Sequence, residues 1–336
     1  MAVVEGASGT QLAETQLAET WLGGRFRLDE RISVEDHISG TCSPEADGLS
    51  LWKATDQLLD RPVTIYLLPA GREVPGGLAE AARAAAKVSD PRLATIYDTD
   101  FSAGCPFIVS EWTRGTPLED LVRSGLPAPA LAAAMIADAA DAVAVAHQAG
   151  VPHLRLTPRS LRWDNSTGLK ITGLGLDAAL SGPALSGPGD DPGVADTRAL
   201  GRMLYALLTG FWPGQDATAL PPAPGHKGQV CTPRQVRAGV PAILDAITYQ
   251  ALRGQAPDAP ARPLTPAGLA MALHGVQRPS IQLANARDAD ARETVQLLEH
   301  AARVEHAARA PRAPRARHAR AREGLLHRTT LLRPAG

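Results

Sequence analysis

The stretch His153-Leu-Arg-Leu-Thr-Pro-Arg-Ser160 is followed along the chain by a second one, Leu169-Lys-Ile-Thr-Gly-Leu-Gly175. The Ser166-Thr-Gly168 turn between them leads into a short expected strand over 169–171, which ends at a pair of glycines. Loops beside the end of a strand are common places for catalytic groups. Neither stretch contains Asp or Glu. The two stretches therefore predict a loop, a strand and a turn whose ionisable groups are all basic.

Apolar segments on the N-terminal side of these stretches are typical of strands. Their alternating or β-branched pattern predicts an antiparallel sheet. One Ala-rich segment, Ala79–Val88, predicts a helix that ends at Ser89-Asp-Pro91. The expected strands lie at Phe26–Leu28, Leu49–Trp52, Val63–Leu68, Ile96–Tyr97 and Phe107–Val109. We therefore expect a small antiparallel β lobe that holds one helix.

The pattern changes after Gly115, where apolar residues recur at helical spacing. The expected helices lie at Leu118–Val122, Ala128–Ala149, Asp196–Leu208, Val240–Ala251 and Thr265–Leu273. A β-rich part followed by a larger helical part predicts an α+β fold with two lobes.

The two ends of the chain differ from this central part. Residues 1–22 contain a Thr-Gln-Leu-Ala-Glu repeat, whose five-residue period gives no single helical face, and we expect a disordered leader. Residues 277–336 hold twelve Arg against six Asp or Glu and few large apolar side chains, which predicts a largely disordered tail. The folded domain is expected over 23–276, with its lobes at 23–112 and 113–276.

Composition limits the classes of partner and compartment. The chain carries a net charge of −1, and its basic tail lacks the aromatic residues that stack on bases, so we expect no specific nucleic-acid partner. Non-specific electrostatic binding of the tail to RNA or anionic lipid remains the alternative. Three cysteines without a C-x-x-C pair predict reduced thiols, and the apolar pattern predicts neither a signal peptide nor a membrane span. We expect a cytoplasmic protein, with peripheral placement at the inner face of the membrane as the alternative.

Three further segments resemble the Hanks-type (eukaryotic-like) bacterial protein kinases. Arg61–Tyr66 is similar to the third strand of that family, Glu111–Leu118 to its hinge and following helix, and Asp196–Gly210 to its central buried helix. The segments occur in the order of the family, and the resemblance covers roughly Gly24–Val276. It implies a two-lobed protein-kinase-like fold.

The resemblance also implies where a kinase would hold its catalytic groups, and each of those groups is missing here. Tyr66 stands at the phosphate-binding lysine, Arg155 at the general base, Ser160 at the metal-binding Asn and Gly173 at the Mg²⁺-binding Asp. A guanidinium cannot accept the substrate proton, and without the carboxylate the bridging metals have no anchor. We therefore expect no catalytic residue, no metal and no cofactor. Lys53 on the preceding strand is a weaker alternative source of positive charge.

Other positions that matter to the family's framework are retained. They are Glu80, His153, Asp196, Gly201 and Arg262. His153 and Asp196 are interpreted as structural hydrogen-bonding groups rather than catalysts. Residues of the kind that is phosphorylated in the family are found at Thr10, Thr15, Thr20, Ser181, Ser186 and Thr197.

Within the family, the chain resembles the pseudokinases of bacterial cell-wall loci that are attached to or encoded beside the lipid II flippase. This resemblance rests on His153–Pro158, Gly173-Leu174 and Pro233–Val240. It implies a catalytically inactive regulatory scaffold in cell-envelope (peptidoglycan) control. The implied partners are an active Ser/Thr kinase that acts in trans and a forkhead-associated domain protein or the lipid II flippase. The alternatives are an atypical serine/threonine kinase and an ATP-binding switch without turnover.

Overall fold

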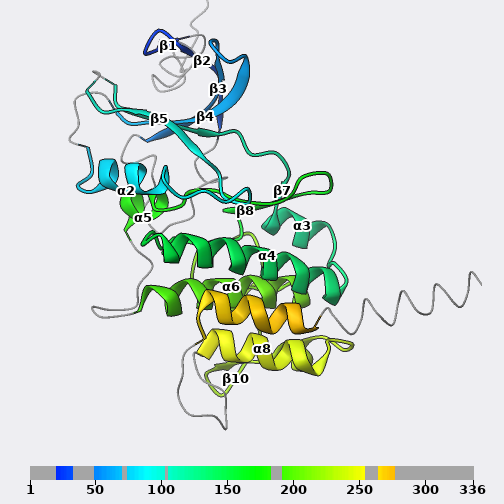
Figure 1. Cartoon of the computed structure of the whole chain (residues 1–336). Helices are drawn as coiled ribbons and strands as arrows, with labels where there is room; N and C mark the ends of the chain where they lie inside the picture. Colours follow the sequence, from blue (N-terminus) through cyan, green and yellow to red (C-terminus); the bar gives the residue numbers. More distant parts are fainter. Residues whose placement is uncertain are drawn as a thin grey trace, which may run out of the picture. The chain divides into compact units, whose positions relative to one another are not determined.

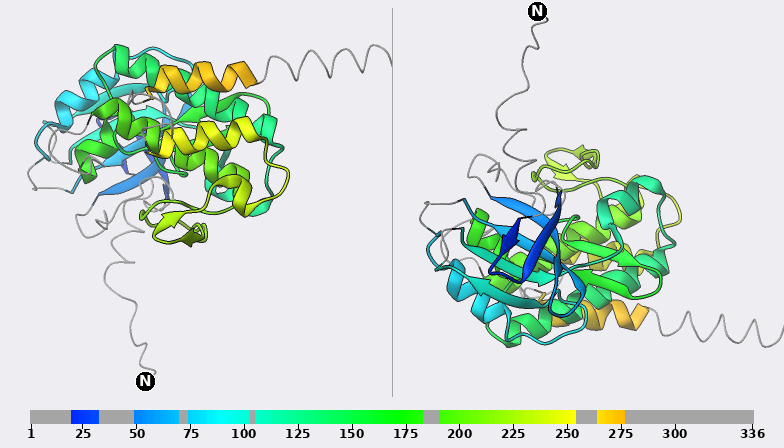
Figure 2. Two further views of the ribbon diagram at one scale, coloured as in Figure 1. Left: turned by 90° about the horizontal axis from the view of Figure 1, so that it is seen from below. Right: turned by 90° about the horizontal axis from the view of Figure 1, so that it is seen from above.

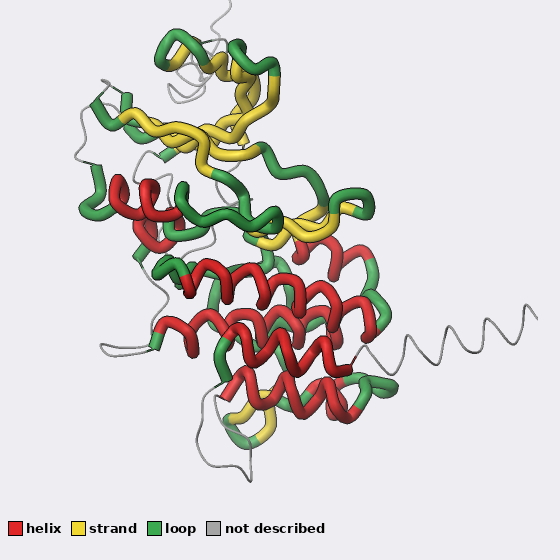
Figure 3. Tube along the Cα trace, in the orientation of Figure 1, coloured by secondary structure: helices red, strands yellow, loops and turns green. Residues whose placement is uncertain are grey.

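The computed structural model describes residues 20–32, 49–69, 74–102, 105–182, 191–253 and 264–276. The chain divides into two units, 1–281 and 282–336, and every described residue belongs to the first. In that unit the strands gather at one end and most of the helices at the other (Figures 1 and 3). This arrangement confirms the predicted α+β fold with a small β lobe and a larger helical lobe.

The small lobe is a six-stranded antiparallel sheet with the strand order β1-β2-β3-β4-β6-β5. Its strands are β1 (Trp21–Leu22), β2 (Phe26–Ile32), β3 (Ser50–Asp56), β4 (Arg61–Leu67), β5 (Ile96–Asp100) and β6 (Phe107–Glu111). Alternate residues of β4 face opposite sides: Ile65 packs in one apolar cluster and Tyr66 in the other. Because both faces are covered, β4 reads as one continuous apolar run.

Helix α2 (Leu78–Ala85) lies on the side of the sheet that faces the large lobe (Figure 1). Its inward positions, Leu78, Ala82 and Ala85, follow helical spacing and are buried. It packs against α5 (Leu176–Ser181), a short helix that the sequence analysis did not predict. The one helix expected in the small lobe is therefore present, and a second helix lies beneath it.

The large lobe is built around two long buried helices, α4 (Pro129–Gln148) and α6 (Pro192–Thr209). The helix α4 is long and apolar enough to cross a membrane by length and composition, but most of its apolar stretch is buried inside this lobe. The N-terminus of α6 is capped by Asp191, whose side chain accepts from the amide of Gly193 at 2.6 Å. A Cβ added at Gly201 would meet the Cβ of Ala251 at 2.7 Å, so glycine lets α6 and α8 (Ala242–Arg253) approach closely.

The remaining elements complete the large lobe. Helix α8 lies alongside α6 (Figure 2). The helix at 266–276 contacts α4, where His274 Nε2 lies 2.8 Å from the carboxylate of Asp141. A small sheet has the order β7-β8-β9, and a hairpin joins β10 to β11. Their bounds are α3 (Leu118–Ser124), α7 (Pro233–Val236), α8 (Ala242–Arg253), β7 (Thr116–Pro117), β8 (Leu161–Asp164), β9 (Gly168–Ile171), β10 (Gly225–His226) and β11 (Gln229–Val230).

The N-terminal boundary of the fold differs from the prediction. Strand β1 pairs with β2, and the carbonyl of Thr20 accepts from the amide of Leu28 at 3.0 Å. Residues 20–22 therefore belong to the sheet rather than to a disordered leader. The repeat pattern hid this, because Thr20 continues the repeat while the next two residues are already apolar.

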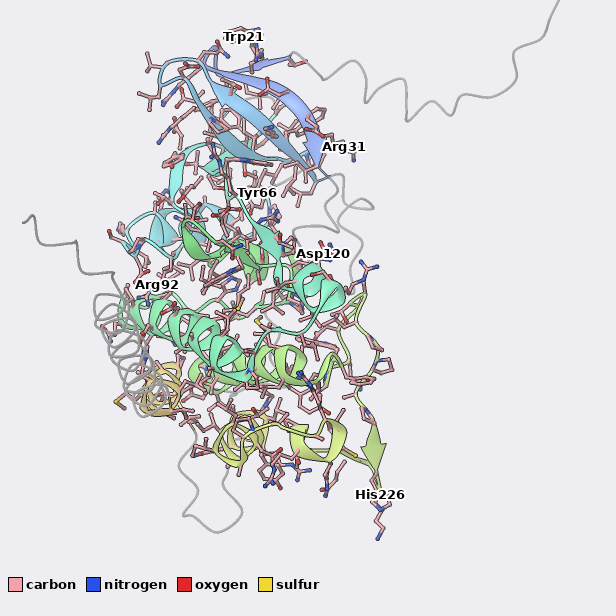
Figure 4. The ribbon with its side chains drawn as sticks, turned by 90° about the vertical axis from the view of Figure 1, so that its right-hand side faces the viewer. Trp21, Arg31, Tyr66, Arg92, Asp120 and His226 are labelled. Atoms are coloured by element: carbon pink, nitrogen blue, oxygen red, sulfur yellow. The ribbon has the colours of Figure 1, made fainter. Side chains whose placement is uncertain are left out.

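Strand β9 connects the two lobes through hydrogen bonds and an ion pair. The amide of Ile171 donates to the carbonyl of Arg92 at 2.7 Å, and its carbonyl accepts from the amide of Ala94 at 2.8 Å. The neighbouring Lys170 forms an ion pair with Glu111 on β6 at 2.6 Å. Arg92 also lies beside α4, 3.6 Å from the carboxylate of Asp141 (Figure 4). The segment that carries Gly173 thus begins at a fixed point between the lobes.

Candidate functional site

Asp196, near the start of α6, organises the loop that begins at His153. Its carboxylate accepts from the backbone amides of His153 at 2.9 Å and Leu154 at 2.7 Å, and it lies 2.7 Å from His147 Nε2. Leu154 has φ +59°, a left-handed conformation that is unfavourable for a branched side chain. The buried carboxylate stabilises this strained backbone by binding both of its amides.

His153 connects the same loop to the segment before Gly173. Its side chain is completely buried, and its Nε2 lies 2.9 Å from the carbonyl of Thr172. Burial lowers the pKa of His153, which keeps the imidazole neutral, and a carbonyl partner requires Nε2 to be the donor. His153 and Asp196 therefore occupy the positions expected of structural hydrogen-bonding groups.

Ser160 has its hydroxyl fully engaged in a local turn. The hydroxyl donates to the carbonyl of Thr157 and accepts from the amide of Thr157, both at 2.8 Å. The carbonyl of Ser160 accepts from the amide of Thr172 at 2.9 Å. These bonds orient the oxygen of Ser160 toward its own turn.

The space beside Gly173 is filled by the side chain of a residue further along the chain. The residue has φ +79°, and a Cβ added to it would collide with the carboxyl group of Asp177 in the first turn of α5. The space into which a side chain at 173 would project is therefore filled by the side chain of Asp177. A carboxylic acid does stand close to the predicted metal position, but it comes from four residues further along the chain.

The environment of Asp177 favours its neutral form. The residue is 2 % exposed, and its Oδ1 has no hydrogen-bond partner among the described residues. Burial raises the pKa of Asp177 well above its usual range, and the nearby charge of Arg155 opposes that shift. A protonated carboxyl group is a poor ligand for Mg²⁺, which prefers anionic oxygen. The sequence analysis missed this residue, although a lone acid in the apolar run Leu174–Leu180 was a usable signal.

Tyr66 and Arg155 border the same region. Tyr66 is 3 % exposed, and its side chain lies where the sheet meets the helices (Figure 4). Burial raises the pKa of Tyr66, and Asp177 adds to the effect. The Nε of Arg155 is buried without a hydrogen-bond partner among the described residues. The structure thus brings three of the predicted positions, Tyr66, Arg155 and Gly173, around Asp177.

Two other predicted side chains do not join this group. Glu80 points to solvent with its side chain 73 % exposed, and it pairs with Arg83 at 3.8 Å on the same helix. This contradicts its assignment as a retained framework residue, because the inward positions of α2 are taken by apolar side chains. Lys53 places its ammonium group over the ring of Trp112, 5.3 Å from the ring centroid.

The predicted phosphorylation sites fall in different environments. Thr197 is 1 % exposed, and its hydroxyl donates to the carbonyl of Gly193 at 2.7 Å, so phosphorylation there would require this part of α6 to open. Ser181 is half-buried at the end of α5, and Thr20 is half-buried beside β1. Thr10, Thr15, Ser186 and the framework residue Arg262 lie outside the described residues.

Within the described part of the chain, no three His, Cys, Asp or Glu side chains are grouped so that they could hold a metal ion. The imidazole of His147 instead lies against the carboxylate of Asp196, and the imidazole of His153 lies against the backbone carbonyl of Thr172. The described centre is thus a hydrogen-bonded loop beside a neutral buried acid.

Comparison with known proteins supports the architecture. No family model matches the chain. Serine/threonine-protein kinase PknB of Mycobacterium leprae is 29% identical over 195 residues, which is 51% of this chain and 31% of that protein. PknL of Mycobacterium bovis is 26% identical over 216 residues, or 57% and 53% of the two chains. The crystal structure of the Mycobacterium tuberculosis PknI kinase domain has a TM-score of 0.56 and 16% identity, covering 77% of this chain and 98% of that one.

The chain therefore has the two-lobed fold of the Hanks-type bacterial serine/threonine protein kinases, as the sequence resemblance implied. It is a kinase-like domain related to PknB and PknL. The chain covers 31% and 53% of the length of the two curated relatives named above.

Proposed function

We propose that this chain is a pseudokinase, a kinase-like domain that regulates other proteins without transferring phosphate. The observation that carries the proposal is the placement of Asp177. Its buried, neutral carboxyl group fills the space in which a side chain at Gly173 would bind magnesium. Without an anionic ligand there, the charge on the triphosphate stays uncompensated.

The other positions support the same proposal. Arg155 brings a permanent positive charge to the position of the general base, and a positioned base contributes a factor of about 10²–10⁴ to such reactions. The hydroxyl of Ser160 is held within its own turn. Tyr66 is buried on β4, where the resemblance implies a lysine. In an active kinase each of these groups contributes separately to the rate, so each replacement removes one contribution.

The test is a titration of the full chain with MgATP, followed by thermal unfolding, together with a radiolabel transfer assay. Ligand at 100 times its Kd stabilises a fold by about 2.7 kcal/mol, and we expect no such increase and no transfer. Transfer of label to the chain or to a protein substrate would overturn the proposal. A thermal shift without transfer would favour the ATP-binding switch instead. Loss of that shift in Lys53→Gln would identify Lys53 as a replacement for the missing lysine.

We further propose that the regulatory role lies in cell-envelope control, as the resemblance to the pseudokinases of cell-wall loci implies. An active Ser/Thr kinase would phosphorylate the chain in trans, and a forkhead-associated domain protein or the lipid II flippase would bind it. The threonines at 10 and 15 are the first choice of acceptor, because each precedes a Gln-Leu-Ala-Glu segment.

This part is tested by phosphorylating the chain with an active Hanks-type kinase and measuring its binding to a forkhead-associated domain by calorimetry. We expect binding of the phosphorylated chain only, and its loss in the double variant Thr10→Ala/Thr15→Ala. Thr20→Ala is the matched control, because its backbone is already part of the sheet. Equal binding of the unmodified chain would contradict a phosphothreonine-dependent partner.

A further inference from the structure

Three arginines line one small cavity beside the loop that Asp196 holds. The cavity has a volume of about 40 Å³, and Arg155 of the loop and Arg198 and Arg202 of α6 contribute to its wall. Arg198 and Arg202 are four residues apart and share one face of the helix. A cavity of roughly 10–15 Å³ holds one water molecule, so this cavity has room for about three oxygen atoms.

The positive charge of this cavity is only partly neutralised. Two carboxylates also line it, Asp196 and Asp216. Asp196 is already bound to two amides and to His147. Asp216 accepts from Arg202 at 3.1 Å. Neither carboxylate forms an ion pair with Arg155 or Arg198 among the described residues.

One further carboxyl group, that of Asp177, interacts electrostatically with Arg155. Burial raises the pKa of Asp177 well above its usual range and the charge of Arg155 opposes that shift, and Asp177 Oδ1 has no hydrogen-bond partner among the described residues. Arg155 keeps a buried Nε without a partner. Burial lowers the pKa of Arg202, Asp216 opposes that shift and Arg198 adds to it, as expected where two cations share a restricted space.

A second, larger hollow of about 270 Å³ continues from the same two helix arginines. Its accessible wall contains Tyr249, over whose ring Arg253 lies, together with Pro213 and Val230. Aromatic and proline surfaces suit apolar side chains of an extended peptide. The larger hollow runs along β11, where Val230 is 40 % exposed. A charged cavity beside an apolar one matches a charged side chain next to an apolar one in a single segment of chain.

We propose that Arg155, Arg198 and Arg202 form a binding site for the phosphate group of a phosphoserine or phosphothreonine in a partner protein, whose neighbouring apolar residue enters the hollow lined by Tyr249 and Val230. Guanidinium groups bind phosphate oxygens with two parallel hydrogen bonds, so a three-arginine cavity suits a dianionic phosphomonoester. The site deepens the proposed regulatory function by naming the partner's chemistry. It would persist if the chain also bound ATP.

The test uses the full chain and two matched peptide libraries, one with a central phosphothreonine or phosphoserine and one with the unmodified residue. We expect binding of the phosphorylated library alone, weakened as the salt concentration rises, because salt screens such ion pairs. Inorganic phosphate is titrated in parallel. Phosphate binding without peptide preference would reduce the site to a free-anion site and overturn the peptide proposal. If neither the phosphopeptides nor inorganic phosphate bind, the three arginines form no phosphate-binding site of either kind.

Charge-removing variants locate the site. Arg198→Gln and Arg155→Gln are each expected to weaken the selected phosphopeptide about 10- to 100-fold, the usual range for hydrogen bonds to a charged group. Arg198→Lys keeps the charge but loses the paired geometry, so we expect an intermediate loss. Arg83→Gln on α2 is the matched control, because Arg83 is exposed and paired with Glu80. Unchanged binding in folded Arg155→Gln and Arg198→Gln proteins would exclude this site.

The same measurements separate this inference from the pseudokinase proposal. If phosphotransfer is found while the variants still weaken the phosphopeptide, the anion site stands and the proposed lack of catalysis fails. If MgATP has no effect and the phosphopeptide does not bind, the pseudokinase proposal stands and the phosphate-binding site is rejected. A competition in which MgATP displaces the phosphopeptide would show one shared site and overturn the separate assignment.

Discussion

The loop held by Asp196 and the region around Gly173 lie on either side of His153. They differ in whether their buried carboxyl group has hydrogen-bond partners. Around Asp196, two amides and an imidazole share one carboxylate. Around Gly173, the carboxyl group of Asp177 is buried with Oδ1 unpaired. Satisfied buried groups stabilise and fix a fold, whereas unsatisfied ones cost about 1–3 kcal/mol. The comparison separates residues that maintain the kinase-like shape from residues at positions where the family resemblance implies catalytic groups.

The largest effect is expected at the satisfied side of this comparison. Asp196→Ala leaves two amides and His147 without their acceptor and releases the strained backbone at Leu154. We expect a loss of about 3–5 kcal/mol in the free energy of unfolding, measured by urea denaturation, as for other broken buried charge networks. Asp196→Asn keeps one acceptor oxygen and should cost less. A loss below about 1 kcal/mol in Asp196→Ala would show that the network is not the anchor of the loop.

The second prediction tests the crowded space at Gly173. Gly173→Ala introduces a Cβ that collides with the carboxyl group of Asp177 at a left-handed backbone position. We expect a destabilisation of about 2–4 kcal/mol, from overpacking and backbone strain together. The double variant Gly173→Ala/Asp177→Ala should recover part of this loss in a double-mutant cycle. Strict additivity of the two substitutions would mean that the side chains do not share the space.

The third prediction concerns the charge state of Asp177. Its folded pKa is raised, so the unfolded chain loses this proton at a lower pH than the folded chain does, and stability falls as pH rises from about 4 to the folded pKa. Asp177→Asn cannot ionise and should be more stable than the parent chain at a pH above the folded pKa of Asp177. The difference should shrink as the pH is lowered toward 4. A difference that grows on acidification would show that Asp177 is ionised in the fold.

The smallest effect is expected for Glu80. Its exposed pairing with Arg83 contributes little, so Glu80→Ala should change the free energy of unfolding by less than about 0.5 kcal/mol. It should also leave the response to MgATP unchanged. A marked change in that response would place Glu80 in the cleft after all.

The sequence predicted the fold well where one signal dominated. The continuous apolar run of β4, the Ala-rich α2 and the long α4 and α6 were all found from periodicity and end signals. The short elements β1, β7, β8, α5 and α7 were missed, because a few residues carry too little pattern to outweigh the turn residues around them.

The candidate site was less predictable than the fold. Tyr66, Arg155 and Gly173 were found from sequence position alone, because each stands where the kinase family, in its fixed order of motifs, has a catalytic group. Asp177 was missed because its role depends on the left-handed turn at Gly173, which folds the next helix back onto the glycine. Motif matching also assigned Glu80 to the framework and Thr197 to the possible phosphosites, but it does not predict their exposure, which depends on how packing rotates each helix.

The attachment of β9 has a consequence for how the chain can move. Ile171 both gives and takes a backbone hydrogen bond across the lobes, and Lys170 beside it holds Glu111. A rotation that separated the lobes here would break all three links at once. Any relative motion of the two lobes is therefore expected to pivot about β9, so the amide protons of Ile171 and Ala94 should be among the slowest to exchange with solvent.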